Sequence, residues 1–364
     1  MTRCDLVFCA GLALALLSST ADASYPYATG LLAVRDVGPA TAHTPACSAV
    51  PDAPASICRT TAHGWAYADS EEGAERAATA LEATAAAFEK YFGRVAPNGA
   101  LVLSATFDRA AADRFSNTHG LGYVLTWLPP EDTRTKVEQV MRRAMPNADE
   151  AKIERALEQL DRQHEDTLRH ELGHSLYGAA FWPHVEAVTA GHYGSPAPDW
   201  LDESAALLME GAGLRQQRES SFLDALRQQS GRVAPIDDFI ARDHPITAQA
   251  RDRLMAQSGQ QTQSGIQIMA AAGEEAARVA AFYSQSLAFA DFLIYTSKDL
   301  RILGKISTAV TEGANFNDWL ANTGPRHGLP GNLPALQSAW DSWCQGKLSV
   351  QAAETARGKG DGGN

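Results

Sequence analysis

Apolar residues recur at helical spacing over most of the chain, whereas the short apolar runs typical of strands lie in its first third. Ala77, Leu81, Ala85, Phe88 and Phe92 form a stripe with the spacing of a helix that buries one face. Strands are predicted at 64–67, 100–107 and 122–127, with one more at 30–35. Further helices are predicted at 135–144, 148–162, 167–178, 200–210, 214–227, 274–295, 300–310 and 333–343. This order predicts an α+β fold, in which a small N-terminal sheet with a helix is followed by a larger, mostly helical half.

The first 23 residues have the pattern of a secretory signal peptide. Arg3 precedes an apolar segment at 6–17, and Ala21-Asp22-Ala23 fits the small-x-small cleavage rule. The alternative is an uncleaved membrane anchor, but the apolar segment is short beside the about 20 residues of a membrane-spanning helix. We therefore expect residues 1–23 to be removed, which predicts a secreted or periplasmic protein with no stable membrane anchor.

Three further segments are expected after the signal peptide. Residues 24–60 form an N-terminal extension or propeptide, in which Cys47 and Cys58 are expected to pair as a local disulfide. Residues 61–346 form the main domain, and Cys344 near its end is expected to be a buried, inert thiol. Residues 347–364 are polar and contain several glycines, so a disordered tail is predicted.

The overall charge excludes one class of partner. The 364-residue chain carries a formal net charge of −12, and no cluster of basic residues opposes it locally. Nucleic-acid binding is therefore not expected. The charge does not define a substrate, so the function has to be inferred from motifs.

The clearest chemical signal is at residues 170–174, which read H-E-L-G-H and match the pattern H-E-x-x-H. At about 100° per residue, His170 and His174 lie about 40° apart around a helix and can reach one metal ion. Glu171 lies on the flank of the same face, where it can accept a proton from a water whose pKa a zinc ion lowers to about 7. Iron uses similar ligands, so the residue types alone leave the metal open.

The same segment also has an apolar face opposite the histidines and one incomplete copy of the motif. Leu168, Leu172 and Leu176 recur every four residues on the side away from the histidines, so that side can pack in a core. His164-Glu165 begins like the motif, but Leu168 stands where a second histidine would be needed. His164 is therefore interpreted as a solvated residue or as one that supports a ligand.

A catalytic zinc usually has three protein ligands and one open position, so a third ligand is needed. The metzincin pattern would require glycine at 177 and histidine at 180, and the chain has Tyr177 and Ala180. His184 and His192 lie on the loop that follows, but loop histidines are more often surface residues. Glu203 is preferred, because it lies on a predicted helix that can pack beside the first one.

The two motifs together carry a family resemblance. H-E-L-G-H and the later P-D-W-L-D-E-S-A-A at 198–206 resemble the gluzincin metallopeptidases of the peptidase-MA-like group, whose second motif reads W-L-x-E-G-x-A. The resemblance implies a zincin-like helical half in which His170, His174 and Glu203 bind Zn²⁺ and Glu171 is the catalytic base. Ser204 stands where the family usually has glycine, and the spacing between the motifs is longer than in thermolysin-like enzymes.

The oxyanion of the transition state usually needs a donor besides the metal. Gluzincins commonly supply a tyrosine or histidine from a downstream helix, and Tyr283 is the preferred candidate here. Tyr177, Tyr193 and His192 are rival candidates. Asp202 either orients a histidine ligand or has an ordinary capping or surface role.

The expected function is hydrolysis of peptide bonds in a peptide or protein substrate by an exported zinc metallopeptidase. The aminopeptidase motif G-x-M-E-N is absent, which favours an endopeptidase or a peptidase of unassigned type. A second hypothesis is a zinc-binding scaffold or binding protein of the same fold that does not hydrolyse peptides. A third is a plain core helix at 160–180 with no metal.

Overall fold

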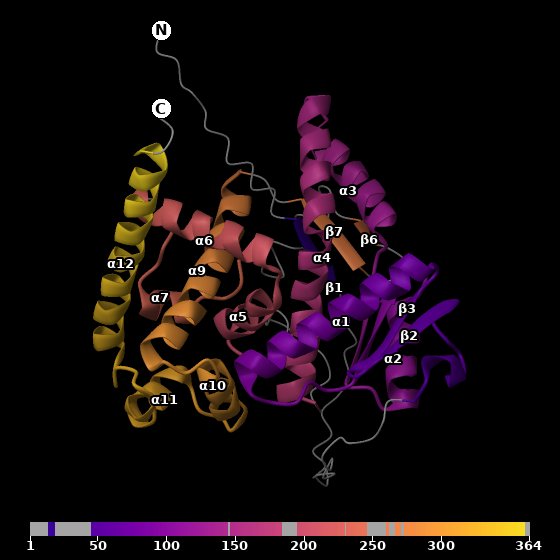
Figure 1. The fold of residues 1–364 in the computed structure, drawn as a ribbon, viewed down its shortest axis with the longest axis horizontal. Helices are drawn as coiled ribbons and strands as arrows, with labels where there is room; N and C mark the ends of the chain where they lie inside the picture. The colour runs from indigo at the N-terminus through magenta and orange to yellow at the C-terminus, as the bar shows by residue number, and fades with distance from the viewer. Residues whose placement is uncertain are drawn as a thin grey trace, which may run out of the picture.

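The computed structural model describes residues 14–18, 45–144, 146–183, 195–229, 231–245, 260–261, 266–270 and 273–360. It has the predicted α+β fold, with a small sheet near the N-terminus followed by a larger helical region. In Figure 1 the N-terminal strands lie on one side, the C-terminal helices lie on the other, and the central helices stand between them.

The N-terminal sheet has four strands in the order β2-β3-β4-β5. These are β2 (Ile57–Thr61), β3 (Gly64–Ala68), β4 (Gly99–Leu103) and β5 (Tyr123–Trp127). Strands β2 and β3 form an antiparallel hairpin, whereas β3, β4 and β5 are parallel. The expected boundary at residue 60 therefore falls inside β2, so the end of the N-terminal extension belongs to the sheet.

Both faces of this sheet are buried. Helix α1 (Glu71–Phe92) packs on one face, against Ala66, Ala68, Leu101 and Leu103. Helix α2 (Arg109–His119) packs on the other through Phe115, in a cluster with Trp65, Tyr67, Ala100 and Val102. Neighbouring residues of one strand thus enter two different cores, which is why the strand sequences are apolar throughout.

One prediction in this region was wrong in detail, and the start of α1 has a simple cap. Ser70 caps α1 by accepting a hydrogen bond from the backbone N–H of Gly73. Strand β4 ends at Leu103, before the predicted end at 107, because the Ser104 hydroxyl accepts backbone N–H groups of the next turn.

The metal-motif helix is α4 (Glu150–Phe181), which has 32 residues and includes the separately predicted helix at 148–162. No proline or glycine interrupts the sequence between residue 150 and Gly173, so the two predicted helices are continuous. Helix α3 (Pro130–Ala144) lies along the N-terminal part of α4. The C-terminal part of α4 buries Leu168, Leu172 and Leu176, as the sequence pattern predicts.

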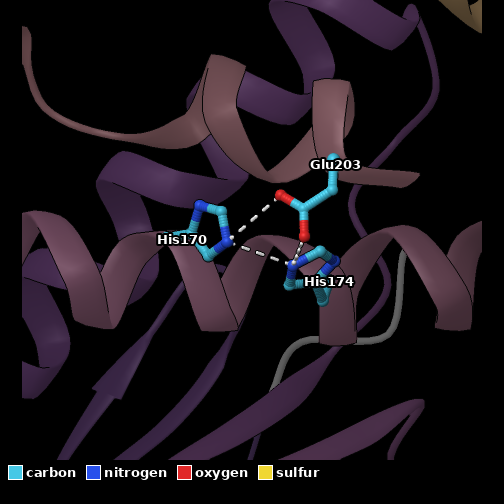
Figure 2. A group of neighbouring side chains, drawn as sticks. All are labelled: His170, His174 and Glu203. Atoms are coloured by element: carbon cyan, nitrogen blue, oxygen red, sulfur yellow. Dashed lines mark hydrogen bonds and ion pairs between the residues drawn. The ribbon is translucent and has the colours of Figure 1, made fainter. Parts of the chain in front are cut away.

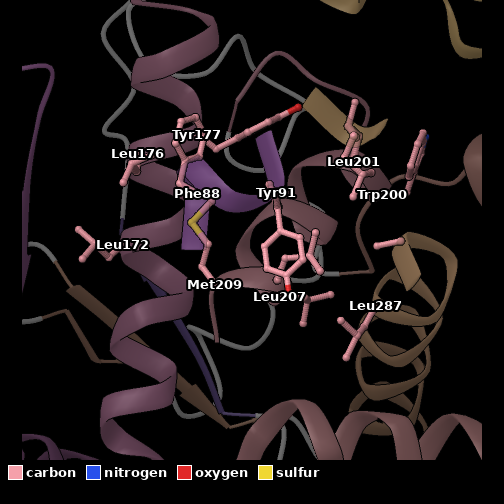
Figure 3. Close-up of a cluster of buried hydrophobic side chains, with 14 of the residues drawn as sticks. Phe88, Tyr91, Leu172, Leu176, Tyr177, Trp200, Leu201, Leu207, Met209 and Leu287 are labelled. Atoms are coloured by element: carbon pink, nitrogen blue, oxygen red, sulfur yellow. The ribbon is translucent and has the colours of Figure 1, made fainter. Parts of the chain in front are cut away.

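Helix α5 (Asp199–Met209) is the centre of the helical region, and all 11 of its residues are buried. It packs between α4 and α9 (Gly273–Ser297), and Figure 3 shows side chains of α1, α4, α5 and α9 meeting in this core. Gly173 of α4 faces α5: a Cβ there would lie 3.0 Å from the Cα of Ala206. The glycine of H-E-L-G-H thus permits the close approach of α5.

The other helices surround this centre. They are α6 (Ala212–Arg227), α7 (Ile236–Ile240), α10 (Ile302–Thr311), α11 (Phe316–Asn322) and α12 (Leu333–Gly360), with short 3-10 turns η1 (Cys47–Ala49) and η2 (Gly324–His327). The aromatic side chains of α9 and α12 form part of the core, including Phe289, Phe292 and Trp340. A second sheet joins β1 (Leu14–Ser18), β7 (Ile266–Ala270) and β6 (Gln260–Gln261) in antiparallel pairs.

The cysteine predictions are confirmed, but the predicted tail is wrong. Cys47 and Cys58 form a disulfide, and Cys344 is free and buried. Helix α12 continues to Gly360, through the segment 347–360 that was expected to be disordered. Good helix formers such as Ala, Gln and Glu fill the segment as far as residue 356, and Lys347 forms an ion pair with Glu219 of α6 that anchors its start.

The N-terminal predictions remain largely untested. Of the proposed signal peptide, only 14–18 is described, as strand β1, and the predicted strand at 30–35 lies outside the described residues. No helix in the described part of the chain has the combination of length and apolar character that a membrane span requires.

Candidate metal centre

His170 and His174 point to one place on the surface of α4. Their Nε2 atoms lie 3.2 Å apart, and their rings are nearly perpendicular, at 83°. Figure 2 shows both rings turned toward the carboxylate of Glu203, which α5 brings from above α4 in that view. The spacing of four residues therefore produces the convergence that the sequence predicts.

Glu203 completes a group of three ligands. Its Oε2 lies 3.6 Å from His170 Nε2, and its Oε1 lies 3.6 Å from His174 Nε2. Ligand atoms at 2.0–2.2 Å from a tetrahedral ion lie about 3.3–3.6 Å from one another. The three side chains thus have the separations of ligands around one ion, and they form a group that can hold a metal.

The hydrogen bonding of Glu203 gives an independent test of this fit. The side chain is 0% exposed, and its oxygens face imidazole nitrogens: His244 Nε2 lies 3.2 Å from Oε1, and the Nε2 atoms of His170 and His174 lie 3.6 Å from Oε2 and Oε1. A buried carboxylate charge is costly, and a cation between it and the two histidine ligands offsets that cost. Burial alone raises the pKa of Glu203, but His174 and its neighbouring histidines outweigh burial and lower it to about 2.

A carboxylate behind each histidine fixes its ring. His174 Nδ1 lies 2.6 Å from Asp202 Oδ2, and the other oxygen of Asp202 accepts the Ser195 hydroxyl at 2.6 Å. A donor at Nδ1 leaves the Nε2 lone pair directed at the metal position. Asp202 therefore has the orienting role, one of the two roles considered from the sequence.

His170 has a different support. Its Nδ1 lies 2.8 Å from Oε1 of Glu210, which is fully buried and forms an ion pair with Arg218 of α6. Burial alone raises the pKa of Glu210, but the positive charge of Arg218 outweighs it and lowers the pKa. The sequence reasoning missed Glu210. The sequence signal for it is its position seven residues, or two helical turns, after Glu203.

The electrostatics of the group favour a cation. Burial by itself lowers the pKa of His174, but the negative charges of Asp202 and Glu203 outweigh burial and raise it to about 10. A site whose potential holds a proton so firmly also attracts a metal ion. Metal binding displaces that proton, because the ligand is the neutral imidazole.

Glu171 lies beside this group without being one of its three ligands. Its carboxyl is buried, and burial raises its pKa to about 7 against the opposing effect of His170 and His174. Glu203 and Asp202 add to the rise through their negative charge. A carboxylate with a pKa near neutrality can both accept and return a proton.

Tyr283 of α9 lies next to the metal ligands. Its ring centroid is 5.7 Å from that of His170, and the ring is half-buried. The rival Tyr177 points into the core, where its hydroxyl lies 2.8 Å from Ser307 Oγ. His184, His192 and Tyr193, which follow α4 in the chain, lie outside the described residues.

His244 is a site neighbour that the sequence did not reveal. It is buried, its Nε2 lies 3.2 Å from Glu203 Oε1, and its backbone N–H donates to Asp199 Oδ2 at 2.5 Å. The residue lies between positions 227 and 274, where the sequence pattern predicts no helix or strand. His164, in contrast, is neither solvated nor near the metal group, because it is buried against Leu128 and Thr133.

Ser204, the departure from the family motif, faces away from the metal ligands. Its hydroxyl lies 2.7 Å from the carbonyl oxygen of Trp200 and 3.0 Å from that of Ser286 on α9. The serine therefore joins α5 to α9 behind the site, and it leaves the position of Glu203 unaffected.

Comparison with protein-family models, curated proteins and solved structures finds no match for this chain. The resemblance to the gluzincins therefore rests on the two sequence motifs alone.

Proposed function

We propose that this chain is an exported zinc metallopeptidase of the gluzincin type. The observation that carries the proposal is the convergence of His170, His174 and Glu203 around one position, with the buried Glu203 oxygens 3.6 Å from the Nε2 atoms of the two histidines. The export component rests on the pattern of residues 1–23 alone.

Zinc suits a donor set of two imidazoles and one carboxylate, which leaves a fourth position open. When bound, it supplies a Lewis acid that lowers the pKa of a water to about 7 and polarises the scissile carbonyl. His170 and His174 present Nε2 because Glu210 and Asp202 accept from their Nδ1 atoms. Glu203 adds the negative ligand.

Glu171 then acts as the general base. It accepts the proton of the attacking water and passes it to the nitrogen of the leaving amine. Its burial beside the ligands supports this role, because a pKa of about 7 lets the carboxyl change protonation state at neutral pH. Tyr283 is the candidate donor to the oxyanion of the tetrahedral transition state, and its ring lies beside His170.

The competing function is that of a zinc-binding protein of the same fold that binds peptides or partner proteins without hydrolysis. A metal site and a catalytic site share the same three ligands, so only the general base separates them. The discriminating residue is therefore Glu171.

The test has two measurements on the purified full-length chain. Metal analysis is expected to give one zinc per chain, and casein or a fluorogenic peptide library is expected to be cleaved. Glu171→Gln should keep the zinc and lose cleavage by about a hundredfold or more, the lower range for general-base catalysis. Glu165→Gln is the matched control, because Glu165 is an exposed carboxylate earlier on α4.

Each outcome separates the candidates. A protein with no bound zinc after reconstitution contradicts both metal functions. Zinc binding without cleavage of any library peptide favours the non-hydrolytic function. Full cleavage by Glu171→Gln would show that another group is the base.

A further inference from the structure

Arg218 is an interior residue on a helix whose surface is mostly polar. Its side chain is 16% exposed, whereas Glu210, its partner, is 0% exposed. The guanidinium donates hydrogen bonds to both carboxylate oxygens of Glu210. Its Nε lies 3.0 Å from Oε1 and 2.7 Å from Oε2, and its Nη2 lies 2.5 Å from Oε1. Two or more parallel N–H donors fix the orientation of a carboxylate, not only its position.

The orientation of Glu210 determines that of His170. Oε1 of Glu210, which accepts a hydrogen bond from Arg218, also accepts one from His170 Nδ1 at 2.8 Å. The opposite nitrogen of the ring, Nε2, then faces Glu203 and His174. The hydrogen-bonded series Arg218–Glu210–His170 therefore connects α6 to the candidate metal position through buried contacts between charged groups.

Arg218 also contacts the candidate oxyanion donor. Its guanidinium carbon lies 4.9 Å from the ring centroid of Tyr283, a cation–π distance, and that ring lies 5.7 Å from the His170 ring. One side chain from α6 thus touches the support of a metal ligand and the aromatic residue next to it.

We infer that Arg218 is a positioning residue that holds His170, through Glu210, in the orientation needed to bind the metal, and that supports the Tyr283 ring beside it. This inference rests on the metal site proposed above. Its physical basis is that a fully buried carboxylate needs a counter-charge, and here the counter-charge comes from α6 rather than from α4 or α5. On the other side of the site, Asp202 is held instead by the neutral donors of Ser195.

Three variants of the full-length protein test the inference. Arg218→Met removes the positive charge. Arg218→Lys keeps the charge but lacks the planar guanidinium, whose several N–H groups can bind both oxygens of a carboxylate. Arg215→Met is the matched control: Arg215 lies one turn earlier on α6, contacts Tyr91 and pairs with Asp291 away from the metal group.

The main readout is zinc affinity, measured by competition with a chromogenic chelator. Arg218→Met is expected to bind zinc about 10–100-fold more weakly, the usual cost of losing an outer partner of a histidine ligand. Arg218→Lys should fall between it and wild type, and Arg215→Met should match wild type. The visible absorption of the Co²⁺-loaded protein should change in both Arg218 variants and stay unchanged in the control. At saturating zinc, a lower kcat with an unchanged KM in Arg218→Lys would report the Tyr283 contact.

The outcomes separate this inference from the proposed function. Wild type that binds no zinc overturns the proposed function, and this inference with it. Zinc-binding wild type with an equally competent, folded Arg218→Met overturns the inference alone. If Arg218→Met does not fold, Arg218→Lys provides the test. Wild-type zinc affinity and an unchanged Co²⁺ spectrum in that variant would overturn the inference that the Arg218 guanidinium orients His170.

Discussion

The middle and the C-terminal part of helix α4 both bury histidine, but only the C-terminal part forms a candidate metal site. In the middle of the helix, His164 Nε2 lies 3.3 Å from the Leu128 carbonyl oxygen and 3.3 Å from the Thr133 hydroxyl. In the C-terminal part, His170 and His174 each contact a buried carboxylate and face a third one, Glu203. The helix and the burial are the same, and the neighbouring elements differ.

The difference lies in what packs against each part of α4. The segment 128–133, at the start of α3, offers a carbonyl and a hydroxyl, so burial lowers the pKa of His164 and the ring stays neutral. The segment from α5 to α6 offers Asp202, Glu203, Glu210 and Arg218, so charges surround the other two histidines. A buried histidine becomes a candidate metal ligand here because an adjacent helix supplies acid groups.

The largest effect is expected from removing the shared carboxylate. Glu203→Ala should weaken zinc binding by more than the about 10–100-fold typical of outer partners, because a direct ligand is lost. Chelator competition measures this effect, with Asp202→Ala as the comparison. Equal losses in the two variants would mean that Glu203 is not a ligand, and the contrast between the two parts of α4 would need another cause.

Stability should distinguish the two histidine supports. In the metal-free protein, Glu210→Ala leaves the Arg218 charge buried without its partner and should cost about 3–5 kcal/mol of unfolding free energy. Asp202→Ala removes one counter-charge of His174, but the Glu203 carboxylate still faces the ring, so this variant should cost about 1–3 kcal/mol. Urea denaturation gives both values. An inverted order would show that the Arg218 charge finds solvent or another partner.

A smaller effect is expected behind the site. Ser204→Gly restores the residue usual in the family, but it removes the contact with the Ser286 carbonyl and places glycine in a helix, for a loss of about 1–2 kcal/mol. Zinc affinity should not change, because Ser204 faces away from the ligands. Ser204→Ala removes the same hydrogen bond without placing glycine in the helix, so it measures the loss of the hydrogen bond alone. A change in zinc affinity would place Ser204 among the residues that position Glu203.

The smallest effect concerns the pH dependence of stability that arises from His164 in the middle of α4. Burial lowers the pKa of His164 in the folded protein, so the unfolded chain binds more protons as pH falls below about 6.5. His164 should therefore cost stability on acidification, by at most about 1.4 kcal/mol per pH unit. Denaturation of wild type and His164→Gln between pH 7.5 and 5 measures the difference. If the unfolding free energies of both proteins change with pH in parallel, His164 is excluded as a source of the acid destabilisation.

Local sequence determined a large part of the fold and the first half of the site. The spacing of four residues places His170 and His174 on one face, and Leu168, Leu172 and Leu176 turn the other face into the core. These relations depend only on helical geometry, which a sequence carries in its period. The strands at 64–67 and 122–127 and the Cys47–Cys58 pair were predictable for similar reasons of pattern and short separation.

The predictions failed where short segments offered competing local choices. The apolar run at 100–107 predicted one long strand, but the Ser104 hydroxyl accepts backbone N–H groups of a turn that ends β4 at Leu103. The glycines after residue 346 suggested disorder, but the helix formers before them and the Lys347–Glu219 ion pair extend α12.

Only the tertiary structure determined what surrounds the two histidines. Glu210 reaches His170 across 40 positions in sequence, and Arg218 and His244 come from elements whose own sequences show no pattern pointing to the site. Their roles depend on how closely α5 and α6 approach α4, which Gly173 permits and the buried core of α5 fixes. Helical period specifies which side chains share a face, but the packing of one helix on another determines which charges that face meets.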